Sequence, residues 1–386
     1  MKEAVVYFPY GVLTAVVAIL PVLILIDAGG TAFQVGLLAA LTAFCNLVGG
    51  IFWPKYLKVT SKASVVVMGY LGLFLGLLMM QNPSLLFLAT AVAVFFPQAI
   101  FYATITELKA RTTALSGNLG RFYSFASVAT AVGYVLGAAG THFLDPLPFA
   151  RVVAFLSLFS IPVVASTLSE ESLGRLVSNG ITEFRRMGSH LAGRNLRVVR
   201  FGFGLEKLPF LLTSSIFSIC FGIVFSQRTN FVKTWRASNF IVYALLLMEV
   251  IISSMVYRLA GRADQKGLYI GHAFLILCLG SFLMAVHFLS LPWIVLAYIF
   301  GGIFWPFINV FYSSYGLGFS EELLGVNLST RSTFYIVGSL LGGFLVENYG
   351  FLLAFAIGTA VALLAPLPFI AGSRIMGKNI NAESQS

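Results

Sequence analysis

One acidic residue lies inside a long apolar run, where an ionisable group can do chemistry. Glu249 is flanked by Leu245–Met248 and Val250–Ile252, close to the centre of a predicted helix over 237–257. A charged side chain at the middle of a membrane costs roughly 3 kcal/mol or more, so it is a functional candidate by default. A carboxyl group there can take a proton from one side and release it to the other. We therefore predict that Glu249 couples transport to protons, with substrate-cation binding and a purely structural carboxyl as alternatives.

Other reactive groups give no catalytic or metal-binding pattern. The three cysteines, Cys45, Cys220 and Cys278, lie in apolar runs without a CxxC motif or a Cys/His cluster, so we predict neither a disulfide nor a metal site. The segment Gly372–Lys378 fits G-x4-G-K, but no strand precedes it and Asn379 follows it, so a phosphate loop is rejected. We predict no cofactor and no catalytic residue, and an ion gradient rather than ATP as the energy source.

The composition requires a membrane. Of the 386 residues, 59% are hydrophobic and only 10% are charged, against about 25% charged in ordinary soluble domains. The mean hydropathy is +0.93. These values exclude a soluble enzyme, a secreted disulfide scaffold, a disordered chain and a coiled coil. They predict an all-α membrane protein.

Turn-forming residues divide the apolar stretches into twelve predicted transmembrane helices. Breaks such as Ala28-Gly29-Gly30 and Glu347-Asn348-Tyr349-Gly350 separate runs that are apolar all round, which excludes the alternating strands of a membrane barrel. The predicted spans are 4–27, 32–54, 63–80, 85–106, 119–140, 150–167, 203–226, 237–257, 268–288, 291–316, 326–346 and 351–371.

The charges predict an orientation. The formal net charge is +10, and most basic residues fall in one set of loops together with both termini. The positive-inside rule places that side in the cytoplasm of the plasma membrane and removes the need for a nucleic-acid partner. The opposite side holds Arg151, Arg228, Lys233 and Arg236. Arg331 is counted as a cytoplasmic anchor of span eleven, with anion or headgroup binding as the alternative.

The longest polar stretch divides the chain into two halves. We predict bundles at 1–167 and 203–371, a linker at 168–202 and a cytoplasmic tail at 372–386. Apolar residues such as Leu176 and Phe184 recur in the linker at mostly three- and four-residue steps. This spacing indicates an amphipathic helix on the inner membrane surface, and a flexible linker is the alternative.

The two halves share a glycine pattern. Spans five and eleven both read G-x12-G-x3-G at an offset of 205 residues, and glycines four apart let helices approach closely. We therefore predict helix-packing roles for Gly133, Gly137, Gly338 and Gly342. Two six-helix bundles in the same orientation, related by a pseudo-twofold axis, form a parallel repeat.

With this repeat, the chain resembles the major facilitator superfamily over nearly its whole length. The basic loop after span two and its copy after span eight resemble the family's G-x-x-x-D-R-x-G-R-K/R motif, although Pro54 and Gly261 replace the acid. The family's acid and arginine at the end of span four resemble Glu107 and Arg111. The resemblance implies a set of gate residues in the cytoplasmic loops: Lys55, Lys58, Glu107, Arg111, Arg262 and Asp264.

The resemblance also implies a central cavity, lined in this family by spans one, four, seven and ten. The candidate cavity residues are Tyr10, Asn46, Gln98, Phe101, Phe304, Trp305 and Asn309. For the polar members, hydrogen bonding between helices explains them as well as ligand contact does. An apolar, aromatic cavity with one acid suits a lipophilic or cationic solute.

These features predict a secondary transporter that works by alternating access, with proton-coupled efflux as the first choice. A proton-coupled importer or passive facilitator of a small metabolite is the second, and a lipid-handling transporter the third. A membrane-embedded enzyme or a sensor comes last, because the spans lack paired acids and no large extra domain is present. The expected partners are a small-molecule substrate, protons and membrane lipids, and we expect a monomer.

Overall fold

The structure, a computed structural model, describes residues 2–110, 115–168, 175–178, 181–182, 184, 207–235, 237–263, 266–319 and 321–372. The regular elements within these ranges are all helical. Eleven helical stretches among them are long and apolar enough to cross a membrane. The last, Val326–Gly372, contains two crossings because the chain reverses at Gly350.

The first half of the chain forms six crossings. They comprise α1 (Lys2–Asp27), α2 (Ala32–Tyr56), α3 (Lys62–Met79), the short η1 (Pro83–Leu85) with α4 (Leu86–Phe95) and α5 (Gln98–Ala110), α6 (Leu115–Phe143) and α7 (Pro146–Leu168). The fourth crossing is interrupted between α4 and α5 at Pro97, which has no backbone N–H to continue the helix.

The second half also forms six crossings. They comprise α9 (Leu208–Phe225) with the short α10 (Arg228–Thr234), α11 (Asn239–Ala260), α12 (Lys266–Phe288), α13 (Leu291–Phe319) and α14 (Glu321–Leu364). Within α14, Gly350 has φ 82°. Glycine adopts this left-handed conformation without steric cost, so the predicted turn lies where the eleventh crossing meets the twelfth.

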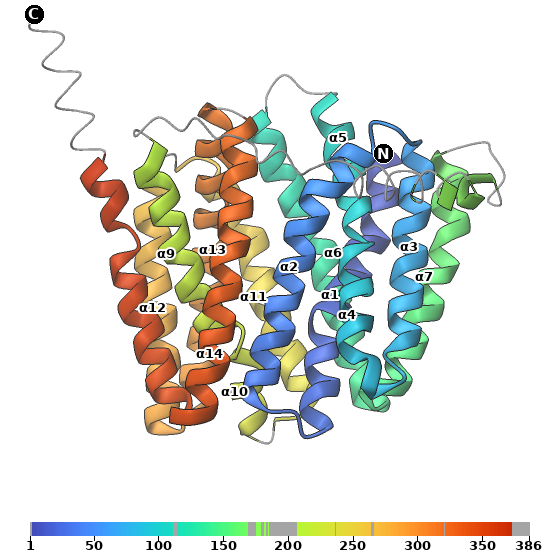
Figure 1. Ribbon diagram of the computed structural model, residues 1–386. Helices are drawn as coiled ribbons and strands as arrows, with labels where there is room; N and C mark the ends of the chain where they lie inside the picture. The colour runs from blue at the N-terminus through green and yellow to red at the C-terminus, as the bar shows by residue number, and fades with distance from the viewer. Residues whose placement is uncertain are drawn as a thin grey trace, which may run out of the picture.

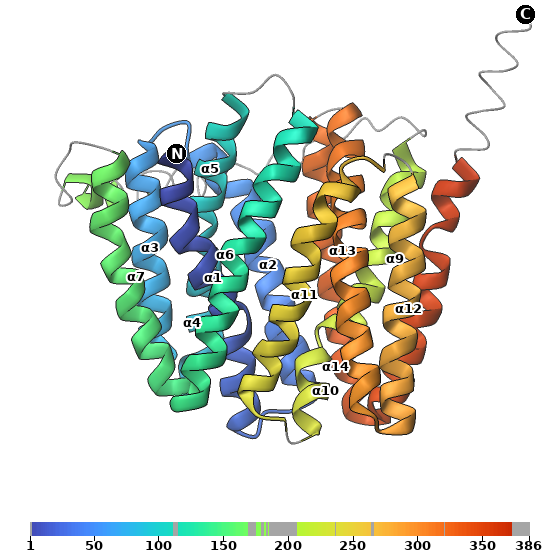
Figure 2. The same cartoon turned by 180° about the vertical axis from the view of Figure 1, so that it is seen from behind.

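The crossings assemble into two six-helix bundles, α1–α7 and α9–α14, seen side by side in Figures 1 and 2. Equivalent helices pack together in each: α1 against α6 in the first bundle, and α9 against α14 in the second. Between the bundles, α2 packs against α14 and α6 against α11. The predicted all-α architecture of two related bundles is confirmed.

Glycines make the equivalent close approaches in both bundles. A Cβ at Gly133 would overlap the backbone carbonyl of Val12 in α1, and a Cβ at Gly338 would overlap that of Ile219 in α9. Gly342 lies equally close to Ile223 of α9, whereas Gly137 faces the ring of Tyr243 across the bundle interface. Three of the four repeat glycines thus lie inside a bundle and one lies between the bundles.

Short pieces of the predicted linker pack on the first bundle. Leu176 is fully buried in that bundle's core. The ring of Phe184 stacks on Phe96 at 5.8 Å and lies 5.4 Å from the ring of Phe52. The rest of the predicted linker helix, and the tail after residue 372, lie outside the described residues.

Polar contacts join the bundles at the end opposite the N-terminus. Lys233 Nζ lies 3.1 Å from Asp27 Oδ1. The backbone N–H of Phe33 donates to Glu347 Oε2 at 2.8 Å. The Gln227 amide donates to the carbonyl of Ala32 at 3.1 Å. In Figure 1, α10 and the turn that joins α1 to α2 lie at the lower end of the molecule, away from the N-terminus. These contacts therefore connect the bundles at that end.

Candidate functional site

Glu249 forms an ion pair in the second bundle. Arg228 Nη1 donates to Glu249 Oε2 at 2.7 Å, and their side chains are only 19% and 12% exposed. From the sequence, Arg228 is counted among the basic residues on the side opposite the termini, and no partner is predicted for Glu249. In the structure α9 ends at Phe225 and α10 begins at Arg228, whose guanidinium reaches the acid at the middle of α11.

Aromatic rings and a glycine surround the pair. The Arg228 guanidinium lies over the rings of Phe225 and Tyr298, at 5.4 and 5.6 Å from their centroids. Gly301 of α13 leaves room for the carboxylate, since a Cβ there would lie 3.1 Å from Glu249 Oε1. A side chain at this position would crowd the acid.

The first bundle also contacts this region. Tyr134 of α6 lies within electrostatic range of both Arg228 and Glu249. Its ring is 6.2 Å from that of Tyr243 in α11, whose hydroxyl donates to the carbonyl of Val16 in α1 at 3.2 Å. The ion pair therefore lies next to the surface on which the two bundles meet.

A second cation, the half-buried Arg331, lies well inside α14, which begins at Glu321. Three rings surround its guanidinium: Tyr312 at 5.2 Å, Phe217 at 5.7 Å and Trp305 at 5.8 Å. These rings come from α9 and α13. The sequence assignment of Arg331 to a cytoplasmic anchor is thus corrected, because the side chain points into the bundle.

Polar aromatic residues continue from this arginine toward the first bundle. Tyr257 of α11 and Tyr123 of α6 both lie within electrostatic range of Arg331. Their rings stack on each other at 5.6 Å and 16°, across the bundle interface. Asn309 Nδ2 donates to the Tyr257 hydroxyl at 3.3 Å. Of the predicted cavity residues, Trp305 and Asn309 therefore lie beside Arg331.

Aromatic contacts connect the two arginines. Trp305 stacks on Phe221 at 5.1 Å, and Phe221 lies 5.8 Å from the ring of Tyr335. Tyr335 is in turn within electrostatic range of Arg228. The two sites are neighbouring parts of one polar and aromatic interior.

No protein-family model matches the sequence, and no curated protein sequence matches it. Solved structures do match it in shape. The nucleoside transporter NupG, as a mutant, superposes with a TM-score of 0.69 at 12% identity, covering 96% of this chain and 98% of that one. The human organic anion transporter MFSD10 (TETRAN) gives 0.62 at 12% identity, covering 95% and 99%. A mutant of the peptide transporter POT in complex with alafosfalin gives 0.69 at 13% identity, covering 97% and 94%.

The chain has the major facilitator superfamily fold. In this fold the two bundles meet along the line where α6 packs on α11 and α2 on α14. Both arginine sites lie on the second-bundle side of that line, and tyrosines of the first bundle face them.

Other predicted cavity residues lie in the first bundle of this superfamily fold. Gln98 is buried and donates to Asn46 Oδ1 at 2.8 Å and to the Cys45 carbonyl at 3.1 Å. Tyr10 packs edge-on against Tyr7 at 5.1 Å. Phe101 packs against Tyr102 at 5.4 Å. The structure thus brings Gln98 and Asn46 together, away from the arginine sites.

Phe304 and the predicted gate residues occupy different surroundings. Phe304 is fully buried and packs edge-on against Phe225 at 5.6 Å, so it lies in the core of the second bundle. Lys55, Lys58 and Arg262 are exposed. The Glu107 side chain, Arg111 and Asp264 lie outside the described residues.

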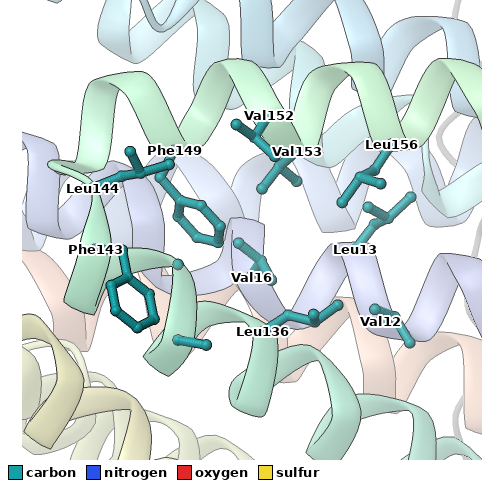
Figure 3. Close-up of a pocket in the computed structure, with 12 residues that line it drawn as sticks. Val12, Leu13, Val16, Leu136, Phe143, Leu144, Phe149, Val152, Val153 and Leu156 are labelled. Carbon is teal, nitrogen blue, oxygen red and sulfur yellow. The ribbon is translucent and has the colours of Figure 1, made fainter.

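An apolar crevice lies apart from the arginine sites. It has a volume of about 260 Å³ and is lined by apolar side chains and glycine of α1, α6 and α7, including Val12, Leu136 and Phe149 (Figure 3). It holds no ionisable group and so positions no chemistry. Among the described residues, no group of three or more His, Cys, Asp or Glu side chains could hold a metal ion.

Proposed function

We propose that this protein is a secondary transporter that couples the movement of a small lipophilic solute to protons by alternating access. The observation that carries the proposal is the Arg228–Glu249 ion pair, which lies deep in the second bundle beside the surface where the bundles meet. The fold shared with solved transporters supports transport, and the pair supports coupling.

Glu249 is the proton carrier in this proposal. When the carboxylate is ionised, it holds Arg228 through the 2.7 Å contact to Nη1. A proton on Oε2 removes that contact and leaves the guanidinium without its counter-charge. An unpaired buried charge is strongly destabilising, so protonation favours a conformation in which Arg228 reaches water or another acceptor.

The bundle interface transmits this change. Tyr134 belongs to the first bundle and lies close to both members of the pair. A shift of Arg228 therefore changes an electrostatic interaction between the bundles. The contacts at the opposite end from the N-terminus, such as Asp27–Lys233, must break when the bundles rock the other way. We place the termini in the cytoplasm, so the structure corresponds to a state closed toward the outside.

A proton-flux assay tests the coupling. Purified protein is reconstituted in liposomes that contain a pH-sensitive dye, and 2-naphthoate, 2-naphthylmethanol and 2-naphthylmethylamine are added in turn. We expect one of these solutes to move with protons in the wild type. The sign of the pH change separates efflux by antiport from import by symport.

Substitution of the acid identifies the carrier. Glu249→Gln should abolish solute accumulation driven by the pH gradient and retain exchange of labelled for unlabelled solute. Asp145→Asn is the matched control, because Asp145 is exposed and makes only a backbone contact to Phe149. Gradient-driven accumulation by Glu249→Gln at the wild-type rate would refute the assignment of Glu249.

A further inference from the structure

We propose that the aromatic cage around Arg331 binds the negatively charged group of the solute, so that the substrate class is small organic anions with an aromatic or apolar body. This inference rests on the proposed transport function and names the substrate class of the same interior. It departs from the cationic solute that the lone acid in the sequence suggested.

Charge balance is the first argument. Glu249 is neutralised by Arg228, so it does not offer a free negative charge to a cation. Arg331 has no such partner, because the groups that act on it electrostatically are Tyr312, Tyr123 and Tyr257, and no carboxylate of the described residues is among them. Among the described residues, the charge that this interior presents to a solute is therefore positive.

The contacts of Arg331 are the second argument. A guanidinium carries five N–H donors in a rigid fork that matches a carboxylate. Its contacts within the described part of the chain are with the ring faces of Phe217, Trp305 and Tyr312. Ring faces attract the positive charge but do not satisfy directional donors. A bound carboxylate would accept from the guanidinium and lie between aromatic walls.

Unpartnered polar atoms beside the cage are the third argument. The buried hydroxyl of Tyr312 has no hydrogen-bond partner among the described residues, and neither do the two amide atoms of Asn327. Asn327 lies four residues before Arg331 in α14, so the two share a helix face. Buried polar groups in proteins are generally paired. The Tyr312 hydroxyl and the Asn327 amide nitrogen can donate to the same anion.

Aromatic side chains continue from the cage toward the ion pair. Trp305 stacks on Phe221, whose ring is 4.2 Å from that of Phe225, so aromatic surface extends from Arg331 toward Arg228. A flat ring attached to a carboxylate would stack along this surface. This arrangement links anion binding at Arg331 to the proton-binding pair.

Direct binding measurements on protein in nanodiscs test the inference separately from transport. Equilibrium dialysis compares 2-naphthoate, 2-naphthylmethanol and 2-naphthylmethylamine, which share a ring system and differ in charge. We expect the wild type to bind 2-naphthoate at least about tenfold more tightly than the other two. Arg331→Gln should raise the Kd for 2-naphthoate at least about tenfold and leave that for 2-naphthylmethanol unchanged, since one charge-assisted contact is lost.

Two further variants make the result decisive. Arg331→Lys keeps the charge but loses the fork, and we expect an intermediate Kd. If Arg331→Gln does not fold, the comparison of Arg331→Lys with wild type carries the test. Arg151→Gln, which removes an exposed arginine whose contact is with Gln81, should bind as the wild type does.

The failures of the two proposals can be told apart. The double variant Arg228→Met and Glu249→Gln leaves no charge of the pair unpaired and keeps Arg331 in place, so it should bind 2-naphthoate within about threefold of wild type. Absence of proton-coupled movement in the wild type, together with Arg331-dependent binding of 2-naphthoate, would overturn only the proposed coupling. Absence of 2-naphthoate binding to the wild type at millimolar concentration, equal binding by both arginine variants and wild type, or tighter binding of the amine would overturn the anion site.

Discussion

The two halves of the repeat use equivalent positions in different ways. Basic residues of the loop after α2 recur in the loop after α11 at offsets of 203 or 204. At an offset of 203, Asn46 corresponds to Glu249. In the first half Asn46 accepts from Gln98 at 2.8 Å, and both groups are neutral. In the second half Glu249 pairs with Arg228 at 2.7 Å.

This difference separates what the fold needs from what the function needs. A neutral hydrogen bond serves the position in the first half, so the architecture does not require a charge there. A buried ion pair is often no more stabilising than an apolar replacement. The charges of the second half are therefore better explained by function. The first half serves as scaffold and places tyrosines at the bundle interface.

Breaking the ion pair should have the largest effect. Arg228→Met leaves Glu249 without its partner, and removal of one member of a buried pair costs about 3–5 kcal/mol. We expect the free energy of unfolding in detergent to fall by about that amount, measured by denaturant titration. Arg228→Met combined with Glu249→Gln should recover most of it, because no charge is left unpaired.

A double variant as unstable as Arg228→Met alone would contradict this account, since the loss would then come from packing around the arginine. The matched control is Arg331→Met, which leaves no acid behind. Its effect on the free energy of unfolding should be well below that of Arg228→Met, because no charge is left without its partner.

Substitution of the equivalent glycines Gly133 and Gly338 should destabilise the two halves to a similar extent. Gly133 approaches Val12, and Gly338 approaches Ile219, through equivalent helix pairs. Gly133→Val and Gly338→Val should each lower the free energy of unfolding by about 1–3 kcal/mol, since overpacking forces backbones apart. Gly280→Val is the control, because no atom lies within 4 Å of a Cβ at that position. Effects that differ by more than about 2 kcal/mol between the halves would show that the repeat is not equivalent in packing.

The neutral hydrogen bond between Gln98 and Asn46 should contribute less to the free energy of unfolding than the Arg228–Glu249 ion pair. Gln98→Leu removes the donor to Asn46, and a neutral hydrogen bond contributes about 0.5–1.5 kcal/mol. Asn46 is exposed, so it can find another partner. We expect a loss in unfolding free energy of about 1 kcal/mol and unchanged proton coupling. Loss of coupling in this variant would mean that the first half takes part in proton transfer.

The sequence predicts the scaffold well because its signals are local. Apolar runs of membrane-spanning length, with Gly and Pro at the breaks, place the helix ends within a few residues of those observed, as at α12 (Lys266–Phe288 against 268–288). Glycine spacing predicts the close approach of Gly338 to α9. Burial of Glu249 follows from its flanking residues alone.

The charge partners could not be predicted in this way, because they depend on where helices bend and meet. Arg228 follows Gln227 at an apparent span end, and only the break between α9 and α10 turns its side chain toward α11. Arg331 is close in sequence to a basic end. Its cage combines rings of α13, the preceding helix, with a ring of α9, which is distant along the chain. One sequence signal did indicate an interior position for Arg331: it lies five residues beyond the start of its predicted span, 326–346.

The smallest effect should come from the ion pair that ties the halves together. Asp27 and Lys233 lie 3.1 Å apart, and the Asp27 side chain is 37% exposed, so solvent screens the attraction. Such pairs contribute about 0–1 kcal/mol and weaken with salt. Asp27→Asn should therefore leave the free energy of unfolding nearly unchanged.

The same substitution should raise, by up to about fivefold, the labelling rate of a cysteine introduced at the exposed Phe33 position on the same end. This rise should shrink at 1 M salt. If the rise is independent of salt, the Phe33–Glu347 and Gln227–Ala32 hydrogen bonds hold the bundles together at this end instead, because ions screen hydrogen bonds less.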